Sequence, residues 1–232
     1  MTTPDSRTPK TAHTLRALAW LLRYPDAELR AAAGELGAAL HDEGALAAGR
    51  LAELDALVRR LAAAPGLRVE AEYVELFDRG RRTALHLFEH VHGDSRDRGP
   101  AMVDLAQTYD RAGLQLVPGE LPDYLPVVLE FASTQPPAQA REFLRETAHI
   151  VQAIFSALLE RGSPYASVLA AVLDLAGERA QKVEVAAEPA LDDSWAEPEA
   201  FGGCTSKGQS RPNEEQPVHL VRPNRAPQRP AA

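Results

Sequence analysis

The amino-acid sequence predicts an all-α protein, a single helical domain of about eight to ten helices with a disordered C-terminal tail. Hydrophobic residues make up 45% of the chain, and most of them are alanine or leucine, which lose little side-chain entropy in a helix. Aromatic residues make up only 6%, whereas sheet-rich folds rely on β-branched and aromatic side chains. Apolar residues also recur at three- and four-residue spacing between proline and glycine breaks, which indicates helices.

Five helices are predicted in the first part of the chain. A leucine stripe ends before Pro25, because proline disfavours the α conformation in the residue before it. Asp26 then offers an N-cap for a second helix, and Pro65-Gly66 ends a third. The predicted ranges are 11–24, 26–40, 45–63, 69–78 and 83–92.

Four further helices follow, each with a start or stop signal. Gly113 is a plausible stop for the first, and Ser163-Pro164 pairs a capping hydroxyl with proline at the first helical position. The predicted ranges are 100–111, 121–133, 136–161 and 163–182. The helix at 136–161 is apolar over most of its circumference, so we expect it to be central.

Composition divides the chain into three parts. Residues 1–10 are polar and are predicted to be flexible, and 11–182 form the helical domain. Residues 183–232 are rich in proline and poor in aliphatic side chains. Such a segment buries too little apolar surface to offset its ordering entropy, so we expect a largely disordered tail.

Charge and cysteine content exclude several classes of protein. The formal net charge of −8 argues against a nucleic-acid partner, because phosphate contacts need a basic face. Cys204 is the single cysteine, so neither an internal disulfide nor a CxxC site can form. The first residues lack the layout of a signal peptide, and no run of 18 apolar residues occurs. We therefore expect a cytoplasmic protein without direct membrane insertion.

One short pattern suggests catalysis. His86, Glu89 and His90 match the H-x-x-E-H form of inverted zinc peptidases, in which two imidazoles on one helical face hold zinc beside a glutamate base. The alternative is a helix with histidines on its polar face and at its C-terminal end, where they complement the macrodipole. Three fixed positions are a weak signal, so we assign no catalytic residue, metal or cofactor.

Two charged segments have both a structural and a binding interpretation. The alternating charges at 94–99 could clamp a peptide, or Asp94, Ser95 or Asp97 could cap the next helix. Glu120 and Asp123 form an acidic edge at a predicted helix start, and the helix dipole alone accounts for Asp123 in a first turn. Phosphate-binding loops and the GxSxG motif are absent from the sequence.

Several longer strings resemble the NarJ family. They are EYVELFD at 72–78, LHLFEHVHGDSRDRG at 85–99, MVDL at 102–105, ELPDYLP at 120–126 and LEF at 129–131. The resemblance covers about residues 12–180, and the string at 85–99 is long and specific.

The resemblance implies a non-catalytic, system-specific chaperone of the redox-enzyme maturation group. Such a protein binds the N-terminal region of the apo catalytic α subunit of respiratory nitrate reductase in the cytoplasm. It keeps that subunit open for insertion of the molybdenum cofactor and delays membrane docking. We expect a monomer. The alternatives are a chaperone for a related molybdoenzyme and the zinc hydrolase described above.

A basic, amphipathic client peptide would place its apolar face in a groove between helices and its Lys or Arg side chains at an acidic rim. Apolar and aromatic side chains would line the groove, and histidines there would make pH-sensitive contacts. The predicted client-binding residues are Tyr73, Leu76, Phe77, Leu85, His86, Phe88, Glu89, His92, Asp94, Asp97, Glu120, Asp123 and Tyr124.

Overall fold

The computed structural model describes residues 10–93 and 95–184, and within them it is all-α. This part of the chain has nine α-helices, one π-helix and one 3-10 helix, which confirms the predicted fold class and helix number. Their bounds are α1 Ala12–Leu21, α2 Ala27–Asp42, α3 Ala48–Ala63, α4 Gly66–Tyr73, η1 Val74–Asp78, η2 Arg81–Thr83, α5 Leu87–His92, α6 Arg98–Arg111, α7 Leu125–Thr134, α8 Pro137–Glu160 and α9 Ala166–Ala176. The predicted flexible start and disordered tail fall mostly outside the described residues.

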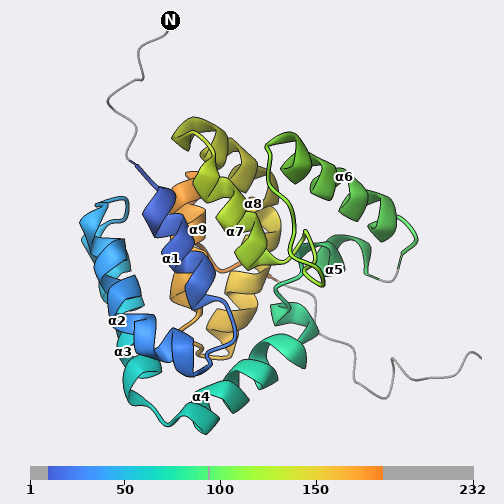
Figure 1. Ribbon diagram of the computed structural model, residues 1–232. Helices are drawn as coiled ribbons and strands as arrows, with labels where there is room; N and C mark the ends of the chain where they lie inside the picture. Colours follow the sequence, from blue (N-terminus) through green and yellow to red (C-terminus); the bar gives the residue numbers. More distant parts are fainter. Residues whose placement is uncertain (1–9, 94, 185–232) are drawn as a thin grey trace, which may run out of the picture. The chain divides into compact units, whose positions relative to one another are not determined.

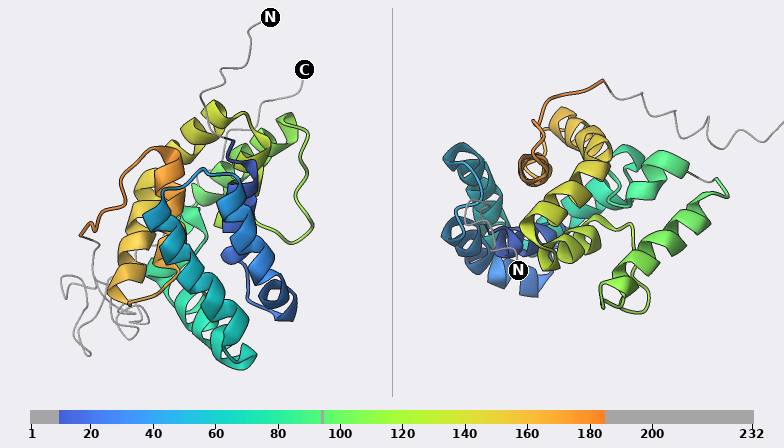
Figure 2. Two further views of the ribbon diagram at one scale, coloured as in Figure 1. Left: turned by 90° about the vertical axis from the view of Figure 1, so that its left-hand side faces the viewer. Right: turned by 90° about the horizontal axis from the view of Figure 1, so that it is seen from above.

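The helices pack in pairs that are close in sequence or are brought together across the fold. α8 packs along α9, α1 along α7, and α2 along α3 (Figure 1). Figure 2 shows α2 and α3 on one side of this helical body and α6 on the opposite side. The pair α8–α9 therefore stands between peripheral helices, as the wide apolar face of α8 predicts.

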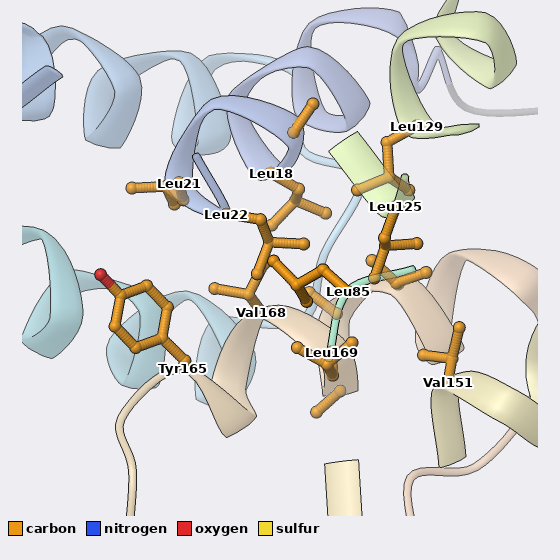
Figure 3. Packing of buried hydrophobic residues seen from close by; sticks show 14 of the residues in the cluster. Leu18, Leu21, Leu22, Leu85, Leu125, Leu129, Val151, Tyr165, Val168 and Leu169 are labelled. Carbon is orange, nitrogen blue, oxygen red and sulfur yellow. The ribbon is translucent and has the colours of Figure 1, made fainter. Parts of the chain in front are cut away.

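The main hydrophobic core lies where α1, α7, α8 and α9 meet. Figure 3 shows Leu18 of α1, and Leu22 just after that helix, facing Val168 and Leu169 of α9, with Leu125 of α7 beside them. All five side chains are fully buried, and each contributes about 1.5–3 kcal/mol through apolar burial. The leucine stripe read from the sequence is the part of α1 that enters this core.

A second, smaller cluster attaches α6 to the rest. Tyr109 of α6 packs against Val127 and Phe131 of α7, and its hydroxyl donates a hydrogen bond to the Pro122 carbonyl at 2.8 Å. Tyr124 packs against both clusters. The loop before α7 therefore connects the two apolar regions.

Several predicted helix boundaries differ from the structure, among them those of α9 and α4. α9 ends at Ala176 rather than near residue 182, because Gly177 takes a left-handed conformation with φ 82°. The predicted helix at 69–78 begins earlier, at Gly66, and changes into the π-helix η1 after Tyr73. A π-helix has a wider turn than an α-helix, so η1 turns its last residues to a different side.

Two carboxylates cap the first helices. Asp26 accepts a hydrogen bond from the Leu29 amide at 2.8 Å and caps α2, as predicted. Glu43, just after α2, accepts hydrogen bonds from the Thr14 and His13 amides at 2.7 and 3.3 Å. It therefore caps α1 from a distant part of the sequence.

No helix in the described residues combines the length and apolar composition needed to cross a membrane.

We predict that Glu43→Gln lowers stability at neutral pH by about 1 kcal/mol, the usual effect of losing a helix cap. Burial alone would raise the pKa of Glu43, but hydrogen bonds from Thr14 and His13 outweigh it and hold the pKa below its usual range. The stabilisation is therefore present at pH 7 and is lost as the pH falls through that lowered pKa. Urea unfolding of both proteins at pH 7 and pH 3 should show the difference shrinking in acid. A constant difference, or an equal loss for the exposed Glu35→Gln on α2, would contradict the prediction.

Candidate functional site

Two of the strings that carry the family resemblance, 85–99 and 120–126, are joined by backbone hydrogen bonds. His86 and Tyr124 form an isolated antiparallel bridge. The Leu125 amide donates to the Leu85 carbonyl at 2.8 Å, and the Leu87 amide donates to the Asp123 carbonyl at 3.0 Å. This pairing corrects two predicted boundaries. α5 begins at Leu87 rather than at residue 83, and α7 at Leu125 rather than at residue 121, because the residue before each helix, His86 or Tyr124, is extended.

Asp123 lies beneath this bridge and is completely buried. Its Oδ2 accepts a hydrogen bond from the Phe88 amide at 3.0 Å, so the carboxylate caps α5. His86 Nδ1 lies 3.5 Å from Oδ1, and Arg98 Nη2 lies 4.0 Å from Oδ2. The prediction that Asp123 stands in the first turn of its own helix is wrong. Asp123 precedes α7 and caps the N-terminus of α5 instead.

A cavity of about 250 Å³ opens beside the bridge. It is lined by Tyr24, Tyr73, Phe77, Asp78, Leu85, His86 and Tyr124. Five of these were predicted client-binding residues, and the fold brings them together from η1 and its neighbours and from the two bridged segments. The sequence interpretation missed Tyr24 and Asp78. In the sequence, Tyr24 is notable only as an aromatic residue directly before Pro25. Asp78 is one of many acidic residues near predicted helix ends.

The floor of this cavity is a cluster of packed aromatic rings around Tyr73. Its ring lies 4.7 Å from Phe77, 5.7 Å from Tyr24 and 6.0 Å from Tyr165, measured between centroids. Its hydroxyl donates to the Leu22 carbonyl at 2.7 Å, and burial raises its pKa. Tyr73 and Phe77 are 4% and 6% exposed. They therefore form a firm base for the cavity rather than an open apolar surface.

Tyr124 forms one wall of the cavity. Its ring stacks on His86 with centroids 5.1 Å apart, and its hydroxyl lies 3.3 Å from that of Tyr73. Burial is the main cause of its raised pKa. The neutral phenol and the imidazole are therefore held as a stacked pair at the edge of the cavity.

A polar cavity of about 360 Å³ adjoins the first, because Asp78 lines both. Its other lining residues are Arg81, Glu89, Gly93 and Arg98. Glu89 lies 3.2 Å from Arg98, whose guanidinium also approaches Asp123. The predicted rim acid Glu89 is therefore already paired with a cation of the same molecule.

The other predicted site residues lie outside the aromatic cavity. Leu76 and Phe88 are half-buried against the main core, and His92 meets the edge of Phe88 at 5.6 Å. Asp97 is exposed, and its amide donates to the Ser95 hydroxyl. Glu120 lines a separate cavity of about 360 Å³ beside Trp20 and Phe131 and lies 3.9 Å from Arg23. Asp94 falls outside the described residues.

The structure does not support a zinc site at His86, Glu89 and His90. His86 precedes α5 with extended backbone, so His86 and His90 do not share a helical face as predicted. His90 Nε2 lies 2.8 Å from the Ala84 carbonyl oxygen, whereas His86 faces Asp123 and Tyr124. Within residues 10–93 and 95–184, no three His, Cys, Asp or Glu side chains gather as metal ligands.

Known proteins resemble this chain over most of the described region. The profile of a family described as nitrate reductase delta subunit matches residues 25–171. NarJ of Escherichia coli K12, named a nitrate reductase molybdenum cofactor assembly chaperone, is 42% identical over 177 residues, 75% of each chain. NarX of Mycobacterium tuberculosis H37Rv, named a nitrate reductase-like protein, is 38% identical over 68% of this chain and 24% of its own length.

A crystal structure from Archaeoglobus fulgidus, described as a redox enzyme maturation protein, has a similar fold. It covers 77% of this chain and 98% of its own, with a TM-score of 0.51 and 20% identity. At that identity the likeness concerns the fold alone.

Asp123→Ala should lower the free energy of unfolding by about 2–3 kcal/mol, because it leaves a buried amide of α5 without its acceptor. Asp123→Asn keeps an oxygen at that place and should recover much of the loss. Denaturant unfolding followed by circular dichroism measures both. The assignment of Asp123 as a buried cap would be wrong if Asp123→Ala cost no more than the exposed Asp97→Ala.

Proposed function

This chain belongs to the nitrate reductase delta subunit family, and from that premise we propose that it is an assembly chaperone of nitrate reductase. In this proposal it binds the apo catalytic α subunit through that subunit's N-terminal region. It holds the subunit ready for insertion of the molybdenum cofactor before membrane docking. The chaperone acts as a cytoplasmic monomer and catalyses no reaction.

The observation that carries the proposal is that two of the family-like strings, 85–99 and 120–126, are joined beside one cavity. His86 and Tyr124 come from segments that are far apart in the sequence, and their bridge forms one side of the aromatic cavity. A bridge made only for stability needs no opening beside it. Here the bridged residues face a space of about 250 Å³, which suits one client side chain.

The arrangement favours modest affinity, as a chaperone that must release its client requires. Most of the aromatic surface at the cavity is already buried against other parts of the chain, so a client adds little new apolar contact. Contacts at the mouth remain for the peptide, through Tyr24, Tyr124, His86 and Asp78. We expect a dissociation constant between about 1 nM and 1 µM.

Calorimetric titration of the full chain with a synthetic peptide of the α subunit's N-terminus tests the proposal. At about 100 µM peptide we expect saturable binding. Tyr124→Ala should weaken it roughly tenfold, because the variant removes a wall of the cavity. Phe143→Ala removes a half-buried ring beside Phe131, away from this cavity, and controls for lost packing.

The proposal would be rejected if the peptide did not bind and the whole apo subunit formed no complex. Equal weakening by Tyr124→Ala and Phe143→Ala would attribute the effect to stability and would reject the aromatic cavity as the binding site. Tighter binding of a peptide from another molybdoenzyme would instead assign the chain to that client.

A further inference from the structure

Asp78 is the exposed carboxylate at the mouth of the aromatic cavity. It is the last residue of η1 and lines both the aromatic and the polar cavity. Among the described residues, no Lys, Arg or His nitrogen lies within 4.0 Å of its carboxylate. The neighbouring acids Glu75 and Glu89 differ in this respect, since they pair with Arg79 and Arg98 at 3.2 Å.

The charge of Asp78 acts on the phenols that surround the cavity. Burial is the main reason why the pKa values of Tyr24, Tyr73 and Tyr124 are raised, and the negative charge of Asp78 adds to all three shifts. The carboxylate is therefore close to three aromatic side chains of the cavity at once. A cation in the same space would have this negative charge and the ring faces within reach.

Most of the other charges that act on the partly exposed phenols of this cavity, Tyr24 and Tyr124, are negative too. Glu70 and Asp26 act on Tyr24, and Glu120 acts on Tyr124. Arg23 is the cation that acts on Tyr124, but it lies between two acids, 3.9 Å from Glu120 and 3.7 Å from Glu130. Arg81 and Arg98 line the adjoining polar cavity, where Arg98 is paired with Glu89. On the aromatic side of Asp78, the balance of charge favours a positive ligand group.

We propose that this cavity is a subsite for one Lys or Arg side chain of the client, and that Asp78 sets that specificity. The inference rests on the proposed function and names the side chain that the site selects. The ammonium or guanidinium group pairs with Asp78, while the aliphatic stem lies against Tyr24 and Tyr124. An apolar side chain would cover the carboxylate without pairing it, which is costly.

The volume agrees with a single long side chain. About 250 Å³ is too small for a helix, so the rest of the client lies outside this cavity. Tyr24 is 45% exposed, which leaves its ring accessible from outside. A basic side chain can therefore enter while the client backbone stays at the surface.

A double-mutant cycle between chaperone and peptide tests the subsite in the full-length protein. Each Arg of the α-subunit N-terminal peptide is replaced in turn by citrulline, and each Lys by norleucine. We expect Asp78→Asn to weaken wild-type peptide binding roughly tenfold. One peptide substitution should cause a similar loss with the wild-type chaperone and almost no further loss with Asp78→Asn. Asp104→Asn, an exposed aspartate on α6, is the matched control.

The subsite would be overturned if Asp78→Asn bound the peptide like the wild type, or if its loss added fully to that of every peptide substitution. Absence of peptide binding to the wild type would count against the proposed function instead. The subsite is then decided by nuclear magnetic resonance titration with acetylated argininamide. Shifts at Tyr24 and Tyr124 that vanish in Asp78→Asn, and that acetylated norleucinamide does not cause, support it. Equal shifts with both compounds reject it.

Discussion

The pairing of residues 85–87 with 123–125 is the constraint on which the rest of the site depends. It stops α5 and α7 from extending backwards and places His86 against Tyr124. Asp123 secures the pairing from below, because its carboxylate and its carbonyl both accept amide hydrogen bonds from the start of α5. A buried carboxylate is expensive to desolvate, and these bonds together with Arg98 offset that cost. Separating the two segments would break these hydrogen bonds together with that from the Leu125 amide to the Leu85 carbonyl, so the pairing resists opening.

Helical periodicity predicted the fold because it depends on local spacing, and it failed where contacts distant in sequence decide the backbone. The leucine stripe of α1 and the Asp26 cap needed only neighbouring residues to be recognised. The starts of α5 and α7 needed knowledge that two extended segments pair, and neither segment has the alternation of a strand. Asp123 is a second case. It was expected to interact with the dipole of the helix that follows it in sequence, but its carboxylate accepts a hydrogen bond from the Phe88 amide of α5.

The candidate site was predictable only in part, for a related reason. Tyr73, Phe77 and Tyr124 were chosen because the strings that contain them resemble a known family, not because spacing placed them together. The resemblance does not indicate how deeply a side chain is buried. Residues that are buried in the cavity floor were therefore expected to line an open groove. Asp78 was passed over because an α-helix through 69–78 gives it no special position. The wider turn of η1 sets it where two cavities meet.

In the aromatic cavity, affinity and selectivity for a client depend on different groups. The packed rings form the floor, and the charged group lies at the mouth. Apolar surface that is already buried in the free protein contributes little to binding a client, so the strength of the complex has to come from contacts at the mouth. Ion pairs there are partly exposed and screened by salt, which keeps each of them weak. Weak contacts give fast release, and in the proposed subsite the single charge of Asp78 at the mouth would still distinguish a basic side chain from an apolar one of similar length. The acidic net charge of the chain acts over a longer range and would raise the rate at which the proposed basic client segment arrives.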